Sequence, residues 1–208
     1  MTIAPYLAWM GLMLVLPSTA WAYSARAATA GVGLLAFFFI VAERKAPSLG
    51  SVIWGLAAGL GVCLLWVWPE SFAFYRRFFI IGGDAQPGAP SPYDPAVCGW
   101  ALTIAKLAGS AFIIAPAEEL FFRSFLYRWI QGGDANGARI DRFDIGAFIW
   151  TVGLFALEHD RYLAGAMAGV IYGLLAIRKG LASAIVAHVV TNLALGLYVI
   201  VCGEWAFW

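Results

Sequence analysis

The chain has 208 residues, of which 62% are hydrophobic and only 12% are charged. Ordinary soluble domains carry roughly 25% charged residues, so this composition predicts an integral membrane protein and argues against a soluble globular domain. The net charge is +1, from 13 basic and 12 acidic residues, and lacks the basic excess that nucleic-acid binding requires.

Apolar segments separated by short polar connections follow one another along the chain. They predict an all-α, polytopic membrane bundle of about seven (seven to eight) transmembrane helices. We expect one transmembrane domain, 1–208, with N-terminal spans and a Pro/Gly-rich connection in 1–96 and a second part in 97–202. The apolar segments are 3–22, 27–42, 49–68, 97–131, 145–158, 162–177 and 181–202.

The first segment ends in Ala20-Trp21-Ala22, which resembles a signal-peptide cleavage site. No Lys or Arg precedes the apolar stretch, as a secretory signal requires, so we expect residues 1–22 to remain as a span. Later in the chain, Arg76 and Arg77 lie among aromatic residues and a run of prolines follows, which predicts an interfacial helix and then a rigid linker.

Two adjacent glutamates, Glu118 and Glu119, interrupt an apolar segment. An ionised side chain at the bilayer centre costs at least about 2.5 kcal/mol, so these carboxylates need partners and mark a functional site. Arg123 follows Glu119 by four residues, in the favourable order for an intrahelical ion pair. Glu118 points about 100° away around the helix, and a histidine would suit it as a partner.

Both histidines of the chain, His159 and His188, also lie in or at the end of apolar segments, and Asn192 follows His188 by one helical turn. Measured from the loops at 132–144 and 178–180, Glu118, His159 and Asn192 lie ~20, ~21 and ~18 Å along their helices, and His188 lies ~12 Å along. Three different segments therefore bring polar groups to a similar depth.

Basic residues flanking the spans favour a cytoplasmic N-terminus and a site in the cytoplasmic half of the membrane. The side of the predicted site carries Arg44, Lys45, Arg128, Arg139, Arg142, Arg178 and Lys179, and the opposite side carries Arg26, Arg76, Arg77 and Arg161.

The order of these motifs resembles the CAAX prenyl protease and bacteriocin-processing (CPBP) family of intramembrane proteases. The resemblance covers roughly residues 97–200, and its motifs are Glu118-Glu119-x-x-x-Arg123, Phe155-x-x-x-His159 and His188-x-x-x-Asn192. Two features depart from the family pattern: Ser124 stands where members often have Gly, and Glu158 adds a carboxylate beside His159.

The resemblance implies a glutamic-type endopeptidase in 97–202 that needs no cofactor. Glu118 and His159 would activate a water molecule, and His188 and Asn192 would stabilise the oxyanion, with support from Glu119, Arg123 and Phe155. It further implies membrane lipids and a membrane-associated or lipidated peptide or protein as partners. The short chain resembles exosortase-associated bacterial members, which implies a multi-pass protein of the bacterial inner membrane and an envelope protein-sorting machinery as a partner.

Three alternatives remain open at the level of sequence. Glu118, His159 and His188 are a possible zinc ligand set, although no HExxH motif supports it and the dispersed cysteines Cys63, Cys98 and Cys202 form no CxxC pair. Intramembrane Glu and His residues also occur in proton-coupled transporters, and a non-catalytic envelope-sorting scaffold is the other possibility.

Overall fold

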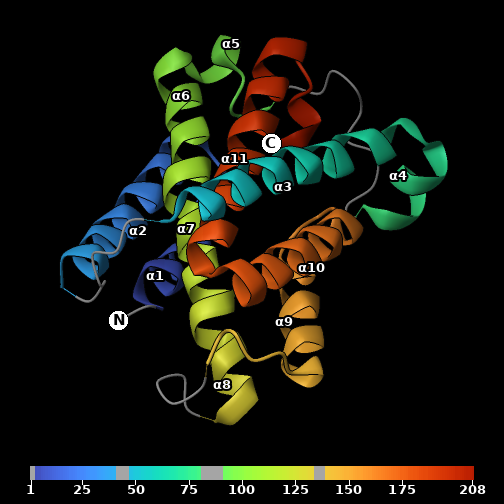
Figure 1. Ribbon diagram of the computed structural model, residues 1–208. Helices are drawn as coiled ribbons and strands as arrows, with labels where there is room; N and C mark the ends of the chain where they lie inside the picture. Colours follow the sequence, from blue (N-terminus) through green and yellow to red (C-terminus); the bar gives the residue numbers. More distant parts are fainter. Residues whose placement is uncertain (1–2, 41–46, 81–90, 134–138) are drawn as a thin grey trace.

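A computed structural model describes residues 3–40, 47–80, 91–133 and 139–208, and within them it contains helices and no strand (Figure 1). The predicted all-α membrane bundle is confirmed. Arg44, Lys45 and the prolines at 87 and 90 lie outside the described residues. In chain order the helices are α1 (Ala4–Met13), α2 (Ala20–Ile40), α3 (Leu49–Val67), η1 (Trp68–Ser71), α4 (Ala73–Phe79), α5 (Pro95–Cys98), α6 (Trp100–Gly109), η2 (Ser110–Ile114), α7 (Ala115–Glu119), η3 (Leu120–Leu126), α8 (Tyr127–Gly132), α9 (Ile145–Leu157), α10 (Tyr162–Lys179), α11 (Leu181–Cys202) and η4 (Trp205–Phe207).

Within the described residues, three continuous helices are long and apolar enough to cross a membrane: Leu49–Ser71, Trp100–Gly132 and Leu181–Cys202. The apolar helix α9 has 13 residues and is about 20 Å long, shorter than the ~30 Å hydrocarbon core. The expected total of seven spans stays a prediction.

The N-terminal boundaries differ from the prediction of one span over 3–22 and another over 27–42. Helix α1 has 10 residues and ends at Met13, and α2 begins at Ala20 and continues through Arg26. The break therefore lies at residues 14–19, where Pro17 cannot continue the hydrogen bonds of α1. Arg26 does not end α2, because its guanidinium is buried and lies 5.3 Å from the ring centroid of Trp9 on α1.

A single helical column runs from Trp100 to Gly132 through the middle of the bundle (Figure 1). Its register widens to π-type turns in η2 and η3, on either side of α7. In η2 the N–H of Ala115 donates to the carbonyl of Ser110, five residues back, just before Pro116, which has no N–H to donate. The two widened turns flank the short helix α7, which carries both glutamates.

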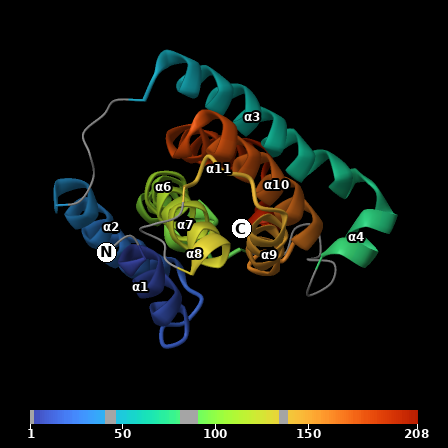
Figure 2. The ribbon, with the colours of Figure 1, turned by 60° about the horizontal axis from the view of Figure 1, so that its bottom comes forward.

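Helix α3 lies along the outside of α11 and α10 (Figure 2). Small residues allow this close approach, since a Cβ on Gly59 would lie 2.5 Å from the carbonyl oxygen of Ala187 on α11. The glycines at 165, 169 and 173 likewise form the face of α10 that packs on α9, where a Cβ on Gly173 would lie 2.8 Å from the ring of Phe148.

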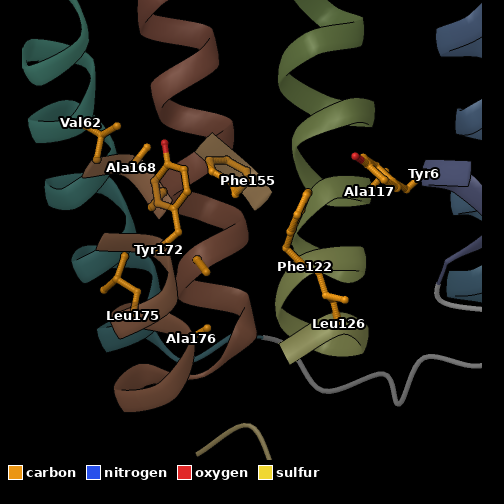
Figure 3. Packing of buried hydrophobic residues seen from close by; sticks show 12 residues of the cluster. Tyr6, Val62, Ala117, Phe122, Leu126, Phe155, Ala168, Tyr172, Leu175 and Ala176 are labelled. Atoms are coloured by element: carbon orange, nitrogen blue, oxygen red, sulfur yellow. The ribbon is translucent and has the colours of Figure 1, made fainter. Parts of the chain in front are cut away.

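One buried cluster joins α1, α3, α10 and α11 to the central column (Figure 3). Its aromatic members are in contact: the ring of Phe155 lies 5.2 Å from Phe122 and 6.3 Å from Tyr172, both edge to face. These packed rings contact the polar residues described next.

Candidate active site

The helix α7 and the turn that follows it place Glu119 and Arg123 in the protein interior. Oε1 of Glu119 accepts a hydrogen bond from Nη1 of Arg123 at 3.0 Å, and the two side chains are 0% and 3% exposed. The guanidinium also donates to the carbonyl of Gly169 at 3.3 Å and lies 4.3 Å from the ring centroid of Phe155. The predicted intrahelical pair is therefore present, and it ties the column to α9 and α10.

His188 of α11 lies between the two glutamates. Its Nδ1 is 2.9 Å from Oε1 of Glu119, and its Nε2 is 3.6 Å from Oε2 of Glu118. Both carboxylates thus approach the same imidazole, from opposite ring nitrogens. The histidine beside Glu118 is His188, whereas the family resemblance paired Glu118 with His159.

The contacts of Glu119 determine the proton positions on His188. Arg123 neutralises Glu119 as a carboxylate, which can only accept hydrogen bonds, so Nδ1 of His188 must carry the hydrogen. Nε2 then faces Glu118, with a lone pair in the neutral imidazole and with a second hydrogen in the imidazolium. A carboxylate that orients an imidazole in this way is the arrangement found in hydrolytic triads.

The ring of Tyr172 packs on His188, and a chain of hydrogen bonds holds Tyr172 in place. The ring of Tyr172 stacks on the imidazole with centroids 4.8 Å apart, and its hydroxyl donates to Oγ1 of Thr191 at 2.7 Å. Thr191 in turn lies 2.9 Å from the carbonyl oxygens of Gly59 and Ala187. Sequence reasoning missed Tyr172 and Thr191. For Thr191 the available signal was its place in the sequence between His188 and Asn192.

His159 follows the C-terminal end of α9. Its Nδ1 lies 2.8 Å from the carbonyl oxygen of Phe155, and because a carbonyl only accepts, Nδ1 carries the hydrogen and Nε2 has a free lone pair in the neutral ring. The imidazole packs against Phe155 and Trp66, with centroids 4.8 and 5.3 Å away. Gly165 of α10 lets the histidine approach closely.

Arg161 anchors the loop that carries His159. Its guanidinium pairs with Glu70 in η1, donates to the carbonyl of Ala206 at 2.9 Å and lies 4.5 Å from the ring centroid of Phe207. This loop is therefore bound both to the end of α3 and to the C-terminal turn η4. Arg161 was identified in the sequence only as a basic flanking residue, because its partners are distant along the chain.

Asn192 completes the set of predicted site residues. Its Nδ2 donates one hydrogen to the carbonyl of Ser110 in the widened turn η2 at 3.0 Å. Because an amide nitrogen carries two hydrogens, a second donor remains on Nδ2.

A cavity of about 240 Å³ connects these side chains. His159, His188 and Asn192 line it, and Glu118, which is not a lining residue, has its Oε2 3.6 Å from Nε2 of His188. The four residues predicted to act together thus come from α7, the α9–α10 loop and α11 to one place. Phe155 lies beneath His159 and His188 as a packing residue.

Residues 100–194 match the family model of the type II CAAX prenyl endopeptidase Rce1-like proteins. These residues belong to the CAAX protease family. The matched segment begins at the start of α6 and includes every predicted site residue. No curated protein and no solved structure matches the chain.

We call helices α6–α11, which contain the matched residues, the CAAX protease core. The expected family assignment is confirmed, and with it the assignment of this core to a class of membrane peptidases. Its departures from the family pattern lie away from the contacts of Glu118: Ser124 follows Arg123 in η3, and Glu158 is exposed at the end of α9.

The CAAX protease core does not gather a three-residue metal cluster from the parts of the chain that the structure describes. His188, one of the three alternative zinc ligands, uses Nδ1 for Glu119 and leaves Nε2 for Glu118.

Proposed function

We propose that this chain is a glutamate-dependent intramembrane endopeptidase in which Glu118 is the general base. The observation that carries the proposal is the placement of His188 between Glu118 and Glu119, beside a cavity that His159 and Asn192 also line. The roles of the four residues follow from their hydrogen-bond chemistry.

Two features of Glu118 support its role as the base. Its Oε2 is buried and has no hydrogen-bond partner among the described residues, which is unusual for a carboxylate. The gap of 3.6 Å to Nε2 of His188 is too long for a direct hydrogen bond. A water molecule about 2.8 Å from each atom bridges such a gap, and this is the position from which we propose the attack on the substrate.

The reaction then proceeds without a covalent enzyme intermediate. Glu118 takes a proton as the water oxygen attacks the peptide carbonyl, and the free lone pair on Nε2 of His159 orients the same water. In this step His188 carries a hydrogen on both ring nitrogens, so that its Nε2–H and the second hydrogen on Nδ2 of Asn192 donate to the developing oxyanion. Protonated Glu118 returns its proton to the leaving nitrogen as the C–N bond breaks.

The position of the site also supports a class of substrate. A cavity inside a membrane helix bundle accepts segments that are themselves membrane-associated or lipidated. We further propose the bacterial inner membrane, from the resemblance to exosortase-associated bacterial members, and a site in the cytoplasmic half, from the basic residues that flank the spans. Association with an envelope protein-sorting machinery belongs to the same proposal.

The test compares wild type with Glu118→Gln in cells, with terminal proteomics of membrane peptides as the readout. We expect cleavage products that are present with wild type and lost with Glu118→Gln. Glu204→Gln is the matched control, because Glu204 is exposed at the end of α11 and does not line the cavity. If both variants yield the wild-type products, the peptidase proposal is wrong.

A second measurement separates this mechanism from zinc catalysis with the same residues. Purified active protein is subjected to metal analysis and chelator treatment. We expect activity to survive the chelator without stoichiometric zinc. Zinc at one equivalent together with loss of activity on chelation would instead establish Glu118, His159 and His188 as ligands.

A further inference from the structure

The cavity is lined by a lysine that the proposed mechanism does not use. Lys106 of α6 lines the cavity together with Asn192 and His188. Its Nζ lies 4.1 Å from the ring centroid of Tyr23, 4.7 Å from that of Tyr93 and 6.0 Å from that of Trp208. The ammonium is therefore enclosed by aromatic faces on one side and open to the cavity on the other.

No carboxylate among the described residues forms an ion pair with Lys106, although Glu158 and Asp160 line the same cavity. Arg161, the other Lys or Arg side chain at the cavity, is already paired with Glu70 and bonded to the carbonyl of Ala206. An ammonium has three donors, and ring faces satisfy none of them as a hydrogen bond to an anion would.

A charge in this position needs an explanation, because ionisable residues within a membrane-spanning helix are costly and mark ligand pathways. Substitution by an apolar residue would keep the packing against Tyr23 and Tyr93 at lower cost. The retained charge thus favours a ligand that brings its own negative charge.

The distance along the column relates Lys106 to the proposed oxyanion site. Ser110, whose carbonyl holds Asn192, follows Lys106 by four residues, which is about 6 Å along a helix. An extended peptide advances roughly 3.3 Å per residue. A group held at Lys106 is therefore within a few residues of a carbonyl held at Asn192.

We propose that Lys106 binds a carboxylate of the peptide substrate and so selects which bond enters the site. The carboxylate is either the C-terminal carboxylate of the substrate or an acidic side chain close to the cleaved bond. Asn192 and His188 then meet the peptide carbonyl, while the aromatic rings hold the ammonium in place. This inference rests on the proposed peptidase function and adds a substrate-binding residue to it.

The test measures binding, so that it does not depend on cleavage. Purified Glu118→Gln protein is titrated with three fluorescein-labelled hexapeptides of alanine, leucine and valine: the free acid, its C-terminal amide, and the amide with one leucine replaced by glutamate. We expect the free acid, the glutamate peptide or both to bind roughly 10- to 100-fold more tightly than the plain amide, the range for a charge-assisted hydrogen bond. The preferred peptide identifies the source of the carboxylate.

Adding Lys106→Met should abolish this preference, and Lys106→Arg should retain part of it. Lys179→Met is the matched control, since Lys179 also lies over an aromatic ring, 5.0 Å from the centroid of Trp54, but does not line the cavity. The inference is overturned if the three peptides bind equally, if none binds, or if Lys106→Met retains the preference. If no cleavage product in cells depends on Glu118, only the peptidase proposal is contradicted, because the binding preference is measured separately.

Discussion

Replacement of Arg123 by methionine tests whether the buried ion pair with Glu119 supports the site structurally. Methionine keeps much of the volume but removes the 3.0 Å ion pair, the hydrogen bond to Gly169 and the contact with the Phe155 ring. Breaking a buried pair from one side costs about 3–5 kcal/mol, because the remaining charge stays in the interior. Glu119 still accepts from Nδ1 of His188, so we expect a loss near the lower end, about 3 kcal/mol.

The assay is reversible unfolding in mixed micelles, measured for Arg123→Met, Glu119→Gln and the double variant. Removing both charges leaves no unpaired ion, so the double variant should be more stable than the sum of the single losses predicts, by roughly 2 kcal/mol. Arg139→Met is the control, because the Arg139–Asp141 pair is 78% and 52% exposed and should leave unfolding unchanged. A loss below about 1 kcal/mol for Arg123→Met, or strict additivity, would refute this reasoning.

Two further substitutions test the packing around His188. Gly59→Ala should lower the free energy of unfolding by about 1–3 kcal/mol, because the added Cβ would lie 2.5 Å from the Ala187 carbonyl oxygen. Gly61→Ala on the same helix meets no atom within 4 Å and should be neutral. Equal effects of the two substitutions in the unfolding assay would contradict the observed α3–α11 contact. Tyr172→Phe should lower the free energy of unfolding by about 1 kcal/mol, because it loses the hydrogen bond to Thr191 but keeps the stacked ring. Tyr172→Leu removes the ring that stacks on His188 and should lower kcat at least about tenfold. Equal kcat values for the two variants, measured on a substrate found by the proteomic comparison, would show that stacking on His188 is unimportant.

The membrane class and most helices follow directly from local sequence. Segments 49–68, 145–158, 162–177 and 181–202 correspond closely to α3, α9, α10 and α11, because long apolar runs bounded by polar or glycine residues leave the backbone no alternative to helix in lipid. The N-terminal boundaries were wrong because the break depends on Pro17 and on the contact of Arg26 with Trp9, which a hydropathy pattern does not contain.

The paired glutamates, both histidines and Asn192 were identifiable as candidate site residues because polar side chains in an apolar helix are costly and seldom without function. The Glu119–Arg123 pair was also predictable, since spacing of four residues along a helix brings two side chains together. These inferences need only the chain's own periodicity and the cost of charge in lipid.

Tertiary structure decided which histidine approaches Glu118, how Glu119 and Tyr172 orient it, and that Lys106 faces the same cavity as Asn192. Helical spacing relates residues within one helix and estimates their depth, but the rotation of one helix against another depends on packing. Here the close contact at Gly59 fixes how α11 packs on α3, widened turns flank α7, and His188 rather than His159 lies beside Glu118.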